Sequence, residues 1–213
     1  MTQQLQTSDT SVPLLSVVVP VYNEEDVLPT FYERCKSTLS ALTGMQHEIV
    51  FVDDGSRDQT LSMLRQLAQS DDTILVASLS RNFGHQVAIT AGLDLARGDA
   101  VVIIDADLQD PPEVIHDFVA KWREGFDVVY AIRNRREGET WAKLATAKYF
   151  YRLLRFFTKT DIPADVGDFR LLSRRAASAL RGLREHDRFV RGLVSWIGFR
   201  QTGIYYERDA RFA

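Results

Sequence analysis

Three aspartates follow a short apolar run in the stretch VVIIDADLQDPP, which covers residues 101–112. Asp105 and Asp107 stand one residue apart, and Asp110 precedes two prolines. Carboxylates provide hard oxygen ligands that suit Mg²⁺ or Mn²⁺, which bind through one or two carboxylates and complete their shell with water and substrate phosphates. The spacing therefore predicts a divalent-metal site at Asp105 and Asp107. Asp110 has a second interpretation, as a helix cap or a turn residue.

Several other ion and phosphate motifs do not fit the sequence. Counted from Asp105, a calcium loop would need Gly at its sixth position and Glu at its twelfth, where this chain has Asp110 and His116. The glycine patterns of the P-loop and of the dinucleotide-binding fold are absent. Cys35 is the only cysteine and the four histidines lack the spacing of zinc ligands, which argues against zinc.

Two further acidic clusters come after apolar runs. PVYNEE covers residues 20–25 and DDGS covers residues 53–56. Each cluster on its own has helix capping as an equally good interpretation. Three clusters that follow three buried strands favour a common binding site, because ligands of parallel sheets bind beyond the carboxyl ends of the strands. Their carboxylates could accept hydrogen bonds from a base N–H and from ribose hydroxyls.

The elements that must position these residues alternate between strand and helix. Short runs rich in β-branched residues predict strands, and apolar residues at helical spacing predict helices between them. Such alternation is typical of an α/β fold with a mostly parallel sheet and helices on both faces. The predicted strands are Leu15–Val19, Glu48–Val52, Ile74–Ser78, Val101–Ile104, Asp127–Ala131, Val166–Leu172 and Arg200–Glu207. The predicted helices are Glu25–Leu42, Asp58–Gln69, His85–Ala96, Pro112–Glu124, Thr140–Thr158 and Ser173–Leu183.

Composition and charge set the broad class. The 213 residues carry a net charge of −3, yet residues 1–132 hold 20 acidic and 8 basic side chains, whereas residues 133–213 hold 9 acidic and 18 basic ones. This split of −12 against +9 suggests two partners of different charge. No apolar run approaches the roughly 20 residues that span a bilayer. A single cysteine fits a reducing compartment, and a net acidic chain without a recognised binding motif argues against nucleic acid.

Five motifs together resemble a known family. VVPVYNEE, VDDGSRD, SRNFGHQVAITAGL, DADLQDPPE and DVGDFRLLSRR occur in this order. They resemble the inverting glycosyltransferases of family 2, which have the GT-A fold. The likeness is strongest to the polyprenyl-phosphate branch, which includes bactoprenol glucosyltransferases and dolichol-phosphate mannosyltransferases. It extends from about Leu15 to Ala213.

The resemblance implies roles for particular residues. Asp105, Asp107 and Gln109 would hold Mg²⁺ or Mn²⁺ on the donor diphosphate. Asp168 stands where many members keep the catalytic carboxylate, and Asp107 would also have a catalytic role. Arg133, Arg170 and Arg211 would meet or support the acceptor phosphate. The nucleotide pocket would be lined by Pro20, Tyr22, Glu24, Asp53, Asp54, Asp105 and Ala106.

The implied reaction moves a hexose, with UDP-glucose as the favoured donor, to polyprenyl phosphate with inversion. A phosphate monoester is largely dianionic at pH 7, so Asp168 could orient groups or bind Arg170 instead of accepting a proton. A polysaccharide or protein hydroxyl acceptor would need Asp168 as a base. A non-catalytic nucleotide-sugar binding module is a further alternative.

The resemblance also implies an organisation and a setting. We divide the chain into a tail (residues 1–13), a nucleotide-sugar and metal-binding half (residues 14–132) and an acceptor-binding half (residues 133–213). Thr140–Thr158 mixes aromatic and basic residues, which suits either a membrane headgroup region or packing on the sheet. We expect a homo-oligomer, such as a tetramer, at the cytoplasmic face of the inner membrane. In the branch, anchoring segments follow the position at which this sequence ends.

Overall fold

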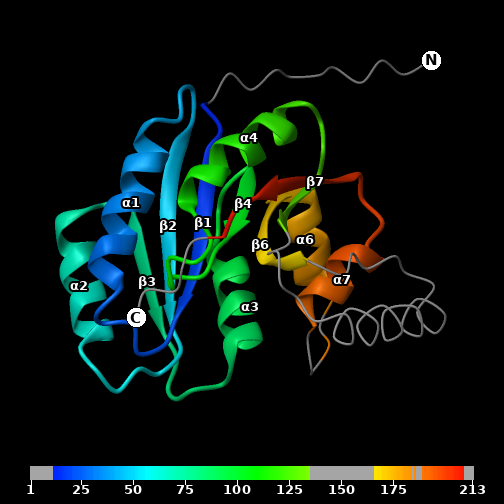
Figure 1. The fold of residues 1–213 in the computed structure, drawn as a ribbon. Helices are drawn as coiled ribbons and strands as arrows, with labels where there is room; N and C mark the ends of the chain where they lie inside the picture. Colours follow the sequence, from blue (N-terminus) through cyan, green and yellow to red (C-terminus); the bar gives the residue numbers. More distant parts are fainter. Residues whose placement is uncertain (1–11, 135–165, 184, 186–188, 209–213) are drawn as a thin grey trace, which may run out of the picture.

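One seven-stranded sheet organises the chain (Figure 1). The computed structural model describes residues 12–134, 166–183, 185 and 189–208. Within them the strands follow the order β3-β2-β1-β4-β6-β5-β7. The strands are β1 (Leu14–Val21), β2 (Gln46–Asp53), β3 (Ile74–Ser78), β4 (Ala100–Ile103), β5 (Val128–Arg133), β6 (Val166–Ser173) and β7 (Gln201–Tyr206).

The sheet is mostly parallel, as the alternation of elements predicted. β1 pairs in parallel with both β2 and β4, β2 with β3, and β5 with β7. β6 is the exception, because it lies antiparallel between β4 and β5. The amino end of β6 therefore meets the carboxyl ends of the other six strands at one edge of the sheet. Strands from both halves of the sequence share this sheet.

Helices cover both faces of the sheet. Their bounds are α1 (Leu28–Ser40), α2 (Thr60–Ser70), α3 (His85–Leu95), the 3₁₀ turn η1 (Pro112–Val114), α4 (Ile115–Arg123), α6 (Arg174–Gly182) and α7 (Val190–Trp196). Buried residues of α1, α2 and α4 form one core layer, and those of α3, α6 and α7 form the other. Successive residues of a strand point to opposite faces, so Val17 and Val19 enter the first layer and Val18 enters the second.

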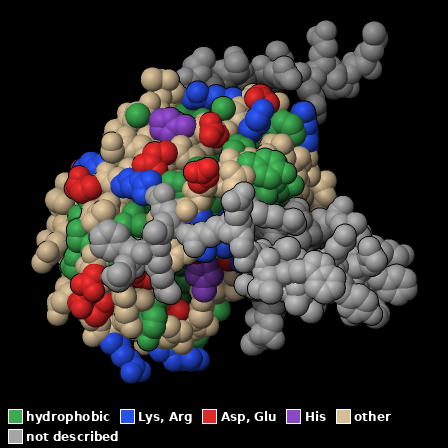
Figure 2. Space-filling view, viewed as in Figure 1, with side chains coloured by type: hydrophobic (Ala, Val, Ile, Leu, Met, Phe, Trp, Pro, Cys, Tyr) green, Lys and Arg blue, Asp and Glu red, His purple; other side chains and the backbone are tan. Residues whose placement is uncertain are grey.

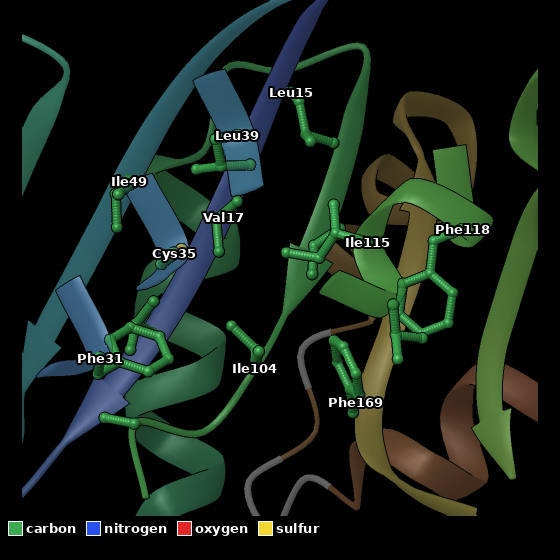
Figure 3. Packing of buried hydrophobic residues seen from close by; sticks show 14 of the residues in the cluster. Leu15, Val17, Phe31, Cys35, Leu39, Ile49, Ile104, Ile115, Phe118 and Phe169 are labelled. Carbon is green, nitrogen blue, oxygen red and sulfur yellow. The ribbon is translucent and has the colours of Figure 1, made fainter. Parts of the chain in front are cut away.

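The first core layer extends across the sheet, from Ile74 of β3 to Tyr206 of β7. Figure 3 shows Phe31 and Cys35 of α1 packed near β1, and Phe118 of α4 against Phe169 of β6. The Phe118 and Phe169 ring centroids lie 4.7 Å apart at an interplanar angle of 59°. Phe169 precedes Arg170 and follows Asp168, so its burial fixes the backbone of the strand that carries both.

Several sequence predictions fall outside the described residues. They are most of the tail, the helix predicted at Thr140–Thr158, and Arg211. Among the residues that the structure does describe, no helix combines the length and the apolar character needed to cross a bilayer.

The approach of α3 to the sheet depends on a glycine. A Cβ added at Gly92 would lie 2.3 Å from Cγ1 of Val18 and 3.2 Å from Cγ2 of Val52. Only a residue without a side chain lets the helix pack this closely on β1 and β2. The close packing matters because the first residue of α3, His85, lies at the edge where the strand ends gather.

We predict that Gly92→Ala destabilises the fold by about 1–3 kcal/mol, the usual cost of overpacking a core. Gly182→Ala is the matched control, because a Cβ at this last residue of α6 would meet nothing within 4 Å. Urea denaturation of the two variants and the wild type measures the difference. Equal midpoints for all three proteins would contradict this account of α3.

Candidate active site

A pocket of about 280 Å³ opens at the edge where the parallel strands end. It lies beyond β1, β2 and β4 and beside the start of α3, which is where the sequence clusters were expected to meet. Seven of the predicted site residues line it: Pro20, Tyr22, Glu24, Asp54, Asp105, Ala106 and Asp107. On the face shown in Figure 2, Asp and Glu side chains lie among Lys and Arg side chains.

The two aspartates at the end of β2 have different positions. Asp53 is fully buried, accepts hydrogen bonds from the Ser56 N–H (3.1 Å) and the Ser78 hydroxyl (3.0 Å), and is not among the residues that line the pocket. Asp54 lines the pocket and accepts hydrogen bonds from the N–H groups of Phe83 (2.7 Å) and Gly84 (2.9 Å). Asp54 thus ties the loop before α3 to the end of β2 and remains at the pocket wall, whereas Asp53 is buried behind it.

The loop after β4 presents the predicted metal ligands. Asp107 Oδ1 accepts a hydrogen bond from the Gln109 N–H (3.0 Å), and the intervening Leu108 has a φ of 58°. This left-handed backbone is uncommon for leucine, and burial of the side chain in the core holds it in place. Gln109 itself is buried. The tight turn aims Asp105 and Asp107 at the same pocket.

Asp105 has the electrostatics of a cation site. Its Oδ1 is buried and accepts no hydrogen bond from the described residues. Burial raises the pKa of Asp105 to about 6, helped by the neighbouring carboxylates of Asp168, Asp107 and Asp110 and opposed by His85. An orphaned oxygen among like charges is stabilised by a bound cation, because the cation offsets both the repulsion and the lost hydration.

The donor set fits Mg²⁺ or Mn²⁺ and not a metal held by protein alone. Among the described residues, no three His, Cys, Asp or Glu side chains are grouped closely enough to hold a metal ion. Asp105 and Asp107 supply two carboxylates beside an open pocket, which leaves coordination sites for diphosphate oxygens and water. The residues present therefore fit an ion that binds together with its substrate.

Asp168 lies at the amino end of β6 and is held by cations. Its Oδ1 accepts a hydrogen bond from Arg191 Nε (3.1 Å), and its Oδ2 accepts from Arg191 Nη2 (3.3 Å) and Gln86 Nε2 (3.4 Å). Burial by itself would raise the pKa of Asp168. Hydrogen bonds from His85 and Arg191 and the charges of Arg191 and Arg170 outweigh burial and hold this pKa well below its usual range.

His85 links the two carboxylates that the sequence assigned to different roles. Its Nε2 lies 3.4 Å from Asp105 Oδ1 and 3.4 Å from Asp168 Oδ2. The hydrogen bond to Asp168, together with the charge of Asp105, raises the pKa of His85 despite its partial burial. The first residue of α3 thus connects the candidate metal site to the candidate catalytic carboxylate.

The three arginines expected at the acceptor phosphate have different positions. Arg133 lies at the edge of the site, where its Nε donates to the Tyr206 hydroxyl (3.2 Å). Arg170 is buried and donates to the backbone carbonyls of Gly167 (2.7 Å) and Asp168 (3.3 Å), so it is not presented to a ligand. Arg211 lies outside the described residues.

Asp110 is neither a helix cap nor a pocket residue in this structure. Its buried carboxylate accepts a hydrogen bond from the Tyr206 hydroxyl and lies 3.8 Å from Arg133 Nη2 and 3.7 Å from Arg208 Nε. It therefore ties the loop after β4 to the ends of β5 and β7. Arg133 lies near Oδ2 of this carboxylate and Arg208 near Oδ1.

Sequence reasoning missed the residues that the loop before α3 and the helix α7 contribute. Asn82, Gly84 and His85 line the pocket, and Arg191 pairs with Asp168. Asn82 to His85 belong to the motif SRNFGH, which follows a predicted strand and opens a predicted helix, so the strand-end argument could have included them. Arg191 offered no comparable signal, because it stands inside a short helix in the second half of the sequence.

Comparison with known families and relatives agrees with these observations. The sequence model described as Glycosyl transferase family 2 matches residues 16–181. The chain is 52% identical over 198 residues to the "uncharacterized glycosyltransferase YkcC" of Bacillus subtilis strain 168, covering 93% of this chain and 61% of the relative. It is 43% identical over 199 residues to the "bactoprenol glucosyl transferase" of Shigella phage SfV, covering 93% and 64%. The chain thus spans about three-fifths of the length of these curated relatives.

Solved structures show the same fold at low sequence identity. The mannosyltransferase PcManGT from Pyrobaculum calidifontis, in complex with GDP-Man and Mn²⁺, matches with a TM-score of 0.65 at 21% identity, over 96% of this chain and 58% of that one. Glucosyl-3-phosphoglycerate synthase from Mycobacterium tuberculosis, in complex with Mn²⁺, UDP and phosphoglyceric acid, matches with a TM-score of 0.65 at 20% identity, over 94% and 72%. These matches confirm the expected GT-A architecture, and the family match covers most of the chain. The chain belongs to glycosyltransferase family 2.

Proposed function

We propose that this chain transfers a hexose from a nucleotide sugar, with UDP-glucose as the favoured donor, to polyprenyl phosphate with inversion at the sugar. The relative from Shigella phage SfV, named a bactoprenol glucosyl transferase, supports this choice of acceptor and sugar. The observation that carries the proposal is the state of Asp168, whose cationic partners keep it ionised and weakly basic.

The donor half of the reaction uses the pocket residues. Tyr22 is partly exposed at the wall of the pocket, where its ring can pack on a nucleotide base. Glu24 and Asp54 also line the pocket and carry carboxylate oxygens that accept hydrogen bonds. Asp105 and Asp107 would hold the divalent ion on the diphosphate. When bound, the ion offsets the charge that develops on the leaving nucleoside diphosphate.

The chemistry at the acceptor side of the reaction differs between a phosphate and a hydroxyl acceptor. A sugar or protein hydroxyl must lose a proton as it attacks, and a positioned base has to take it. Asp168 suits that task poorly, because Arg191 and His85 stabilise its charged form. A phosphate monoester, with a second pKa near 6, is already largely dianionic at pH 7 and needs no base. One phosphate oxygen can then form the bond to the sugar C1 while the bond from C1 to the diphosphate oxygen breaks, and its electron pair leaves with the diphosphate.

A basic group at the edge supports an anionic acceptor. Arg133 and Arg208 are each about one third exposed, at 36% and 34%, and face the single carboxylate of Asp110. Both lie farther than 3.5 Å from that carboxylate, so, within the part of the chain that the structure describes, neither hydrogen-bonds to it and both have donors for a second anion. Gly167 keeps room for Arg133, because a Cβ there would lie 3.0 Å from its Nη2. We assign Arg133 to the acceptor phosphate, with Arg208 as its neighbour.

Donor binding is tested by calorimetric titration with UDP, UDP-glucose and GDP in Mg²⁺ or Mn²⁺ and in EDTA. We expect binding of UDP and UDP-glucose but not GDP. The binding heat should disappear in EDTA and in Asp105→Ala and Asp107→Ala, because the diphosphate then loses its ion. Asp72→Ala, which removes an exposed aspartate before β3, is the control and should bind as the wild type does. Equal binding with and without metal would contradict the assignment.

Acceptor chemistry is tested by the pH dependence of the rate with a short-chain polyprenyl phosphate. The rate should rise as the pH increases through about 6, because the dianion is the nucleophile. Asp168→Asn should keep this midpoint and lower the rate by less than about 10⁴-fold, the upper range of base catalysis. Loss of the inflection in Asp168→Asn, or faster transfer to a hydroxyl acceptor, would favour the hydroxyl alternative. Donor binding without turnover on either acceptor would favour a binding module.

A further inference from the structure

The proposed function uses Arg191 as a partner of Asp168 and assigns it no contact with the acceptor. It is the second residue of α7, and its side chain is 35% exposed. Its Nε and Nη2 donate to the two oxygens of Asp168, at 3.1 and 3.3 Å. Asp168 itself is only 8% exposed, so the guanidinium lies between this buried carboxylate and solvent.

The pairing uses one side of the guanidinium and leaves the other side available. An arginine carries five N–H donors in a planar fork, and the Nε–Nη2 edge accounts for the contact with Asp168. Nη1 makes no hydrogen bond or ion pair with the residues that the structure describes. Arg191 can therefore hold the carboxylate and donate to a second anion at the same time.

The position of Arg191 is fixed by contacts of α7 with α3 and with the core. The Val190 N–H donates to Gln86 Oε1 (3.1 Å), and Gln86 Nε2 donates in turn to Asp168 (3.4 Å). Val190 and Val194 are buried in the core layer shared with α3 and α6. These contacts hold the helix, and so the guanidinium, beside His85 and the candidate reaction centre.

The local charges explain why a cation is needed there. Asp105, Asp107 and Asp168 converge at one edge, and a dianionic acceptor that approached them would be repelled. Arg170 cannot offset this charge for a ligand, because its side chain is buried and donates to backbone carbonyls. Arg133 and Arg208 are grouped around Asp110 instead. Arg191 is the described arginine whose side chain contacts Asp168 and also remains partly exposed.

We propose that Arg191 binds the phosphate monoester of the acceptor directly, through the donors that Asp168 does not use. The inference rests on the proposed function and adds to it the residue that brings the phosphate to the reaction centre. Asp168 then acts as a positioning residue, because it orients the fork of Arg191.

A double-mutant cycle with Asp168 tests this role. The cycle compares the wild type, Arg191→Ala, Asp168→Asn and the double variant, measuring KM and kcat with a short-chain polyprenyl phosphate in detergent micelles. We expect Arg191→Ala to raise the acceptor KM about tenfold to a hundredfold in the wild-type background, as for loss of a charge-assisted hydrogen bond. In the Asp168→Asn background the increase should be smaller but still measurable, because Arg191 is then less well oriented and still donates to the phosphate. Arg191→Lys should recover part of the loss because it restores the charge. UDP binding in the presence of Mg²⁺ should stay within about twofold of the wild type.

Arg34→Ala is the matched control. Arg34 also pairs through Nε and Nη2 with a carboxylate, that of Glu113, at 2.7 and 2.9 Å, and its side chain is 33% exposed. It lies on α1 and does not line the pocket. Its loss should leave the acceptor KM unchanged, which separates the removal of any paired arginine from the removal of this one.

Three outcomes would overturn the inference. If Arg191→Ala has no further effect in the Asp168→Asn background, Arg191 serves only to hold Asp168. If UDP binding falls together with acceptor use, Arg191 belongs to the donor site or to the fold. If inorganic phosphate competes with the lipid in the wild type and equally well in Arg191→Ala, the phosphate is bound elsewhere. A wild type that uses a polyprenol or another hydroxyl acceptor, but no lipid phosphate, would instead refute the proposed function itself.

Discussion

The antiparallel insertion of β6 between β4 and β5 is the constraint on which the candidate site depends. The register pairs Ile103 of β4 with Arg170 of β6. This is the last pair of the two strands, and it lies at the edge where the parallel strands end. Asp105 follows β4 and Asp168 lies near the amino end of β6, so the backbone pairing brings two carboxylates to the same place. A parallel strand in that position would have delivered its carboxyl end and left Asp168 at the opposite edge of the sheet.

The carboxylates of Asp105 and Asp168 repel each other at this edge, and the surrounding residues stabilise the charge of Asp168 more than that of Asp105. Arg191 and Gln86 donate hydrogen bonds to Asp168, His85 lies 3.4 Å from it, and the pKa of Asp168 is lowered despite its burial. Asp105 has a buried oxygen without a hydrogen bond, and its pKa rises to about 6. Asp168 thus pairs with both Arg191 and His85, whereas Asp105 shares the same histidine at 3.4 Å and keeps a buried oxygen without a hydrogen bond, which an external cation can contact. This division matches a reaction in which the metal-bound diphosphate leaves and the acceptor arrives already charged.

The arginines near the site also differ in the partners that the fold gives them. The side chain of Arg170 is buried, donates to backbone carbonyls of β6 and so supports the strand that carries Asp168. Arg133 and Arg208 gather on Asp110, which the sequence alone would suggest to be a cap. Arg191 reaches Asp168 from a helix whose packing on α3 sets its position. Four residues of one chemical type therefore have three different environments.

The sequence by itself determined the α/β class and placed acidic residues at strand ends, because β-branched runs and helical spacing are local properties. The acidic clusters at strand ends indicated one edge, and the family resemblance added the individual pocket residues. The pocket contains Pro20, Tyr22, Glu24, Asp54, Asp105, Ala106 and Asp107. Tertiary structure alone decided that both Asp53 oxygens bond within the protein, that Arg170 is buried, and that Arg191 meets Asp168. These outcomes depend on contacts between distant positions, such as Gln86 and Asp168, which are 82 residues apart. Strand order and side-chain burial set such contacts, and neither is encoded in the spacing of neighbouring residues.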